Sequence, residues 1–185
     1  EFSASSRELH VALGQSAFTT KGISLEILNE TQQISGHVSY ASADLYPSTL
    51  LNPGIMGWYS FVPFMECKHG VVSMQHKLSG GLQINGQYVD FEGGTGYIEK
   101  DWGKSFPSAY IWMQSNHFSK PGISLKASVA KIPWLRSSFV GFIAGIRINN
   151  KLIRFTTYNK SSLIKSHVDK HSVALIFENS EHILK

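Results

Sequence analysis

The sequence predicts an all-β protein, with short antiparallel strands that follow one another along the chain and either close into a barrel or fold into a sandwich. Short apolar or alternating segments recur between turn residues along the 185-residue chain. No window carries a sustained helical period with capping residues at both ends. An Asn-Gly pair at residues 85–86 stands between alternating residues, which is a strong local signal for a β-hairpin.

Each expected strand is a stretch in which apolar residues alternate with polar ones or cluster between turns. Residues 22–28 alternate most cleanly, because Ile23, Leu25 and Ile27 fall on one face. Two hairpins are expected, one over residues 81–91 and one over residues 145–158 with its turn at Asn149-Asn150. The other expected strands are residues 9–13, 22–28, 33–40, 71–78, 97–102, 109–118, 123–130, 172–177 and 182–184.

Residues 52–66, NPGIMGWYSFVPFME, do not fit a regular strand. Pro53 and Pro63 lack the amide donor that a central strand requires, so a turn followed by an irregular or edge strand is expected. Two interpretations of its aromatic residues, Trp58 among them, stay open. The segment is either a buried aromatic plug that closes one end of a barrel or the wall of a ligand pocket.

Composition excludes several classes of protein. Hydrophobic residues make up 42% and charged residues 16% of the chain, which is typical of a globular protein. The net charge of +4 comes from scattered basic residues, so we expect no nucleic-acid partner. Cys67 is the only cysteine, and no apolar run is long enough to span a bilayer, so a soluble, cytoplasmic protein is predicted. Both ends of the sequence look like strands, which indicates a segment of a longer protein.

The stretch from residue 94 to 118, GTGYIEKDWGKSFPSAYIWMQSNHF, concentrates charge beside aromatic residues. An extended strand over residues 97–102 places Tyr97, Glu99 and Asp101 on one face. The following strand places Trp112, Gln114 and Asn116 on one face. Such a mixture of aromatic and amide groups is typical of a ligand pocket, although Glu99 and Lys100 could equally form a surface ion pair. The histidines show no metal-binding spacing, so no metal site is expected.

Three stretches resemble the tocopherol cyclase-like family: residues 53–67, PGIMGWYSFVPFMEC; residues 90–107, DFEGGTGYIEKDWGKSFP; and residues 111–118, IWMQSNHF. The family's plant members carry a similar Tyr-x-Glu-Lys-Asn-Trp-Gly run, then Phe-Pro, then Trp-x-Gln-x-Asn. The flanking sequence is similar to bacterial members. The matching positions are Tyr97, Glu99, Lys100, Trp102, Gly103, Phe106, Pro107, Trp112, Gln114 and Asn116, whereas Asp101 stands where plant members have Asn.

This resemblance implies lipocalin-like β-barrels, related in architecture to carotenoid hydratases. Residues 1–107 would form the latter part of a first barrel and residues 108–185 the beginning of a second, with one continuous β domain as the alternative. The implied activity is that of a cyclase or isomerase, which adds a proton to an alkene of a prenylated or other apolar small molecule and captures the cation with a phenol oxygen. No cofactor is expected, and membrane contact would be transient, for substrate pickup.

The resemblance also suggests roles for individual residues. Glu99 or Asp101 would be the proton donor, with Glu66 a more remote candidate, because an apolar site can keep a carboxylic acid protonated. The aromatic rings of Trp58, Tyr97, Trp102 and Trp112 would stabilise the cation. Gln114 and Asn116 would hold the phenol oxygens. The alternative function is that of a non-catalytic, lipocalin-like carrier of a hydrophobic small molecule.

Overall fold

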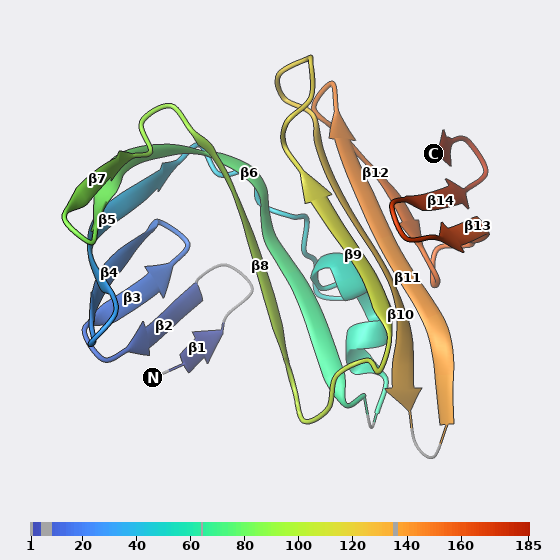
Figure 1. Ribbon diagram of the computed structural model, residues 1–185. Coiled ribbons are helices and arrows are strands. Elements are labelled where there is room, and N and C mark those ends of the chain that lie inside the picture. The colour runs from blue at the N-terminus through green and yellow to red at the C-terminus, as the bar shows by residue number, and fades with distance from the viewer. Residues whose placement is uncertain (1, 5–8, 64, 135–136) are drawn as a thin grey trace. The chain divides into compact units, whose positions relative to one another are not determined.

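A computed structural model describes residues 2–4, 9–63, 65–134 and 137–185, and within these ranges the protein is all-β, as predicted (Figure 1). Its strands are β1 (Phe2–Ala4), β2 (Leu9–Leu13), β3 (Ser16–Thr19), β4 (Gly22–Leu28), β5 (Gln33–Ala41), β6 (Cys67–Ile84), β7 (Gln87–Asp90), β8 (Thr95–Gly103), β9 (Tyr110–Ser115), β10 (Ser124–Trp134), β11 (Ser137–Ile148), β12 (Lys151–Thr156), β13 (Ser162–Val168), β14 (Val173–Glu178) and β15 (Ile183–Leu184). A 3₁₀-helix, η1 (Gly54–Phe61), lies between β5 and β6.

The strands form three sheets, and the pairings with a recorded register are antiparallel. The first sheet runs in chain order from β1 to β7, with β8 also paired to β6. The second has the order β12-β11-β10-β9, and the third has the order β13-β14-β15. Most strands thus pair with their neighbours in the sequence, as expected for short hairpin connections, whereas β8 pairs with β6. In the described part of the chain, none of the three sheets closes into a barrel.

The contacts within the chain define two compact units, each made of two stretches of sequence. Unit 1 comprises residues 1–48 and 71–100, and unit 2 comprises residues 49–70 and 101–185. Unit 1 contains most of the first sheet, and unit 2 contains η1 with the second and third sheets. The assignment of residues 1–107 and 108–185 to two barrels stays a prediction.

Both predicted hairpin turns are confirmed. Asn85 and Gly86 have φ values of 50° and 81° and connect β6 to β7, with Ile84 opposite Gln87. Asn149 and Asn150 have φ values of 50° and 59° and connect β11 to β12. Positive φ at both central positions is the requirement of a type I′ turn, which glycine and asparagine meet at the least cost.

The segment around η1 differs from its prediction. Residues 54–61 were expected to be a turn and an irregular or edge strand, and that expectation is wrong, because they form 3₁₀ turns that are broken at Gly57. Gly57 has φ 54° and ψ −142°, a conformation open essentially to glycine alone. The prediction also lacked strands β3 and β13. Within the described residues, no helix is both long enough and apolar enough to cross a membrane.

The core of unit 2 lies between its two sheets. Phe155 of β12 is 1% exposed, and its ring centroid is 6.3 Å from that of Phe177 on β14. Phe142 of β11 lies 5.6 Å from Phe177. The buried members of this cluster are Ala127, Val129, Phe142, Ala144, Phe155, Leu175 and Phe177. One face of the second sheet is therefore apolar and is covered by the third sheet, which leaves the opposite face for polar residues.

A buried histidine lies in unit 1. His76 on β6 is 3% exposed, packs against Tyr40 with ring centroids 4.3 Å apart and ring planes tilted by 41°, and has its Nδ1 3.1 Å from the Ser73 hydroxyl oxygen. Burial lowers the pKa of the His76 imidazole below its usual value. The charged imidazole is therefore less stable in the folded protein than in the unfolded chain.

This burial predicts that unit 1 loses stability in mild acid. As the pH falls through the unfolded histidine pKa of about 6.5, the unfolded chain takes up a proton before the folded protein does, so the free energy of unfolding decreases. We expect His76→Gln to reduce the loss of stability between pH 7 and pH 5 in urea denaturation. His37→Gln, at an exposed histidine, is the control. An equal pH dependence in the His76 variant and the unmodified protein would contradict this account.

Candidate functional site

Tyr97 and Glu99 point to the same side of β8, as alternation predicts. Both are half-buried, and the Tyr97 hydroxyl donates a hydrogen bond to Glu99 Oε2. A carboxyl group held by a phenol has a fixed orientation and a neighbour through which a proton can pass. These two residues form the acidic part of the candidate site, and both belong to unit 1.

Asp101, two residues further along β8, is the more exposed of the two carboxylates. Its side chain is 43% exposed, and its Oδ1 contacts Nδ1 of His69. The carboxylate also acts on the nearby Cys67 thiol, whose pKa is raised by burial first and then by the charges of Asp101 and Glu66. Cys67 is therefore an unreactive thiol. The backbone oxygen of Glu66 accepts a hydrogen bond from the amide of Lys104 at 2.8 Å.

Gly103 in the same motif has a structural role. Its φ is 157°, and a Cβ at this position would overlap the backbone of Glu66 and Cys67. The close approach of two backbones explains why glycine follows Trp102 here. Part of the Glu-Lys-Asp-Trp-Gly motif therefore reflects packing rather than chemistry.

Trp112 and Gln114 share a face of β9. Gln114 Nε2 donates a hydrogen bond to Asn116 Oδ1 at 2.6 Å, which places Asn116, just beyond the strand, on the same side. Across the sheet, Gln114 lies opposite Lys126 of β10, and Trp112 lies opposite Ser128. The predicted common face of these three residues is thus present.

This face of the second sheet carries polar side chains that are fully buried. Lys126 and Ser124 of β10 and Thr156 of β12 are each 0% exposed. Lysine is almost never fully buried in a core. The register aligns Lys126 with Gly145 of β11 and Gly145 with Arg154 of β12, so Lys126 and Arg154 flank a position that has no side chain.

Arg154 and Thr156 also line a cavity of about 250 Å³. The complete lining is Leu51, Asn52, Trp58, Arg154, Thr156, Tyr158 and Asn159, all within unit 2. Its walls combine one cation, several hydroxyl and amide groups, and two apolar side chains. A concave site with a few polar groups against apolar walls is the usual form of a small-molecule site.

Trp58 and Tyr158 form the aromatic wall of this cavity. Trp58 of η1 is 51% exposed and stacks on Tyr59 with centroids 4.5 Å apart. The Tyr158 hydroxyl donates a hydrogen bond to the backbone oxygen of Ile55, which ties η1 to the end of β12. Burial raises the pKa of Tyr158, and the Thr156 hydroxyl and the charge of Arg154 oppose that shift. Tyr158 is therefore a neutral phenol near pH 7.

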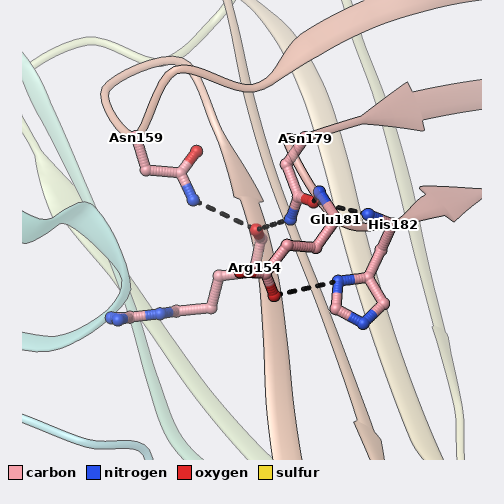
Figure 2. A network of polar contacts seen from close by, with 5 residues as sticks. All are labelled: Arg154, Asn159, Asn179, Glu181 and His182. Carbon is pink, nitrogen blue, oxygen red and sulfur yellow. Dashed lines mark hydrogen bonds and ion pairs between the residues drawn. The ribbon is translucent and has the colours of Figure 1, made fainter.

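A polar network fixes the backbone from which Arg154 extends (Figure 2). The Arg154 carbonyl oxygen accepts hydrogen bonds from Asn159 Nδ2 at 3.0 Å and from Asn179 Nδ2 at 3.3 Å. Asn159 Oδ1 in turn accepts from the Thr156 amide at 2.9 Å. Figure 2 shows the guanidinium pointing away from both asparagines. The network thus fixes the backbone of Arg154, and the guanidinium takes no part in these hydrogen bonds.

Gly57 determines whether this wall can form. A Cβ at residue 57 would overlap Asn52 Oδ1 and the Tyr158 ring, and both groups line the cavity. We expect Gly57→Ala to lower the free energy of unfolding by about 3 kcal/mol, through backbone strain and overpacking. Gly54→Ala is the control, because Gly54 also has positive φ, at 64°, but a Cβ there meets no atom. Its cost should be about 1 kcal/mol. Chemical denaturation measures both, and equal costs would contradict the steric explanation.

The structure brings some of the predicted site residues together. Tyr97 pairs with Glu99, and Gln114 pairs with Asn116 beside Trp112. Asp101 and Trp102 are exposed at the end of β8, and Trp58 lies at the cavity. The sequence-based prediction omitted Lys126, Arg154, Thr156 and Tyr158. Little in the sequence indicated them, because polar residues that alternate with apolar ones are typical of the solvent-facing side of a strand.

Comparison with known proteins places these features among related sequences. Residues 25–172 match a family described as tocopherol cyclase-like. The chain is similar to a tocopherol cyclase, chloroplastic, from Zea mays and to a probable tocopherol cyclase, chloroplastic, from Oryza sativa subsp. japonica, each 32% identical over 114 residues. These alignments cover 61% of the chain but only 20% and 21% of the two plant proteins, so the chain spans about a fifth of their length. No solved structure matches.

Proposed function

Because the chain belongs to the tocopherol cyclase-like family, we propose that it takes part in a proton-initiated cyclisation of a prenylated or other apolar small molecule. In this reaction a proton adds to an alkene, the phenol oxygen bonds to the resulting cation, and the phenol proton leaves. The product is an isomer of the substrate, and no redox step occurs. Such chemistry needs a placed acid, aromatic rings and polar groups for the phenol.

The observation that carries the proposal is the hydrogen bond from Tyr97 to Glu99. Glu99 is half-buried, and its carboxyl group is oriented by the phenol of Tyr97. We assign proton delivery to Glu99, with Tyr97 as the group that fixes the orientation of its carboxyl group, and the proton that the substrate phenol releases restores the acid. Asp101 fits this role less well, because it is exposed and contacts His69.

The remaining assignments follow the chemistry of the side chains. Trp58, Trp102 and Trp112 are 51%, 38% and 46% exposed, so part of each ring is open to a ligand. Indole faces stabilise cations more strongly than other aromatic side chains do. Gln114 and Asn116 present hydrogen-bonding amides beside Trp112 and would hold the phenol oxygens. The lipocalin-like barrels, a cytoplasmic location, transient membrane contact and membership of a bacterial branch remain predictions.

A carrier of a hydrophobic small molecule is the second candidate function. The cavity with Trp58 and Leu51 in its wall favours it, because apolar walls bind a ligand without any chemistry. A carrier needs no acid near its ligand. The two functions therefore differ in what happens to a bound alkene.

Incubation with a prenylated hydroquinone distinguishes them. The cyclase should convert it to an isomer of equal mass and different chromatographic retention, whereas a carrier would retain it unchanged. A hydroquinone with a saturated side chain is the control, since it has no alkene to protonate. Recovery of unchanged substrate would reject the cyclase, and failure to retain the substrate as well would reject both functions.

A further inference from the structure

The cavity of unit 2 contains a cation without an acidic partner. Its lining includes Arg154 but no aspartate or glutamate. Among the residues that the structure describes, no carboxylate forms an ion pair with Arg154. A guanidinium carries five donors in a rigid fork that matches a planar anion.

Thr156 supplies a second polar group with unmet hydrogen-bonding capacity. The residue is 0% exposed, and its hydroxyl makes no hydrogen bond within the described ranges. The hydroxyl is close enough to Tyr158 to affect the phenol's pKa, but not in hydrogen-bond geometry with it. A buried hydroxyl left unpaired is unfavourable, and in native proteins such a group usually has a partner. Thr156 lines the cavity, but its hydroxyl oxygen has almost no accessible surface, so the hydroxyl is not itself a contact for a bound molecule.

The charge balance identifies the chemical class of the ligand. One guanidinium with neutral hydroxyl and amide groups compensates one negative charge, which suits a carboxylate better than a phosphate dianion. A carboxylic acid is ionised at neutral pH, whereas a phenol with a pKa near 10 is not. Leu51 and Trp58 form the apolar part of the lining and suit a hydrocarbon or aromatic group.

We propose that this cavity binds a small organic carboxylate that carries an apolar or aromatic group. The carboxylate pairs with Arg154, and the apolar group lies against Trp58 and Leu51. Asn159 and Asn179 hydrogen-bond to the Arg154 carbonyl oxygen, so the strand backbone is already fixed before the ligand binds. The cavity shares Trp58 with the proposed cyclisation, but the inference does not rest on that reaction.

Titration of the protein with 4-fluorobenzoate, followed by fluorine NMR, tests the proposal. Saturable binding is expected, with 4-fluorobenzamide as the neutral probe of matched shape binding at least tenfold more weakly. Arg154→Gln should weaken benzoate binding about tenfold or more. Lys151→Gln is the control, because it removes a positive charge from an exposed position of the same strand, and its affinity should stay within about twofold of the unmodified protein.

Each result of these binding experiments either supports the carboxylate site or overturns it. The benzamide comparison uses the unmodified protein and does not depend on whether a variant folds. Equal binding of the amide and the carboxylate, or absence of saturable benzoate binding, would overturn the proposal. So would an unchanged affinity in Arg154→Gln, or displacement of benzoate by inorganic phosphate at lower concentration, which would assign the cavity to phosphate. A thermal unfolding curve for each variant confirms that a lost affinity is not a lost fold.

Discussion

Replacing Glu99 with glutamine should lower the rate of cyclisation about 100-fold or more, because the amide keeps the shape of the side chain and removes its acidic proton. General acids at active sites contribute rate factors of this size. The measurement is the initial rate of isomer formation from a prenylated hydroquinone by the purified protein. Thermal unfolding of the variant should remain close to that of the unmodified protein.

Two matched variants control this experiment. Glu92→Gln removes a carboxylate from an exposed position that precedes β8, and Asp101→Asn removes the exposed carboxylate that contacts His69. Both should keep the rate within about threefold of the unmodified protein, because neither residue is the assigned donor. A folded Glu99→Gln protein with an undiminished rate would reject Glu99 as the acid. A large loss in Asp101→Asn alone would transfer that role to Asp101.

Phe155→Ala should have the largest effect on stability, with a loss of about 3–5 kcal/mol in the free energy of unfolding. Phe155 is 1% exposed and packs against Phe177 between the two sheets of unit 2. Truncation removes buried surface and leaves a cavity that close-packed neighbours cannot fill. Guanidinium denaturation, followed by tryptophan fluorescence, measures the change, since all four tryptophans of the chain lie in unit 2.

Val140→Ala on the neighbouring strand is the control for this prediction. Val140 is 61% exposed, so its truncation removes little buried surface and should cost less than about 1 kcal/mol. A cost for Phe155→Ala no larger than that of Val140→Ala would show that the cluster around Phe177 is not the core of unit 2.

Local sequence rules predicted most of the strands and both type I′ turns. Side chains alternate between the two faces of any β-strand. Asn-Gly and Asn-Asn occur at these turns because asparagine and glycine adopt positive φ at the least cost. The common side of Tyr97 and Glu99, and that of Trp112 and Gln114, follow from the same period of two. These features depend on neighbours in the sequence, so the sequence alone could predict them.

The residues around the cavity depend on contacts between distant segments. The 3₁₀ turns of η1 have no helical period, and residue 57 is restricted to glycine because Asn52 and Tyr158 leave no room for a side chain. Lys126 and Thr156 alternate with apolar residues as solvent-facing groups would, yet both are fully buried. Nothing local distinguishes a buried polar face from an exposed one, because burial is decided by what packs over the sheet.

The central claim is that the protein adds a proton to an alkene, and cyclisation in heavy water tests it most directly. The added proton comes from a carboxyl group that exchanges with solvent, so the product formed in D₂O should carry one non-exchangeable deuterium, at the former alkene carbon next to the new cation centre. Mass spectrometry and NMR of the isolated product measure this label. Product that forms without the deuterium, or substrate recovered unchanged from the folded protein, would contradict the account.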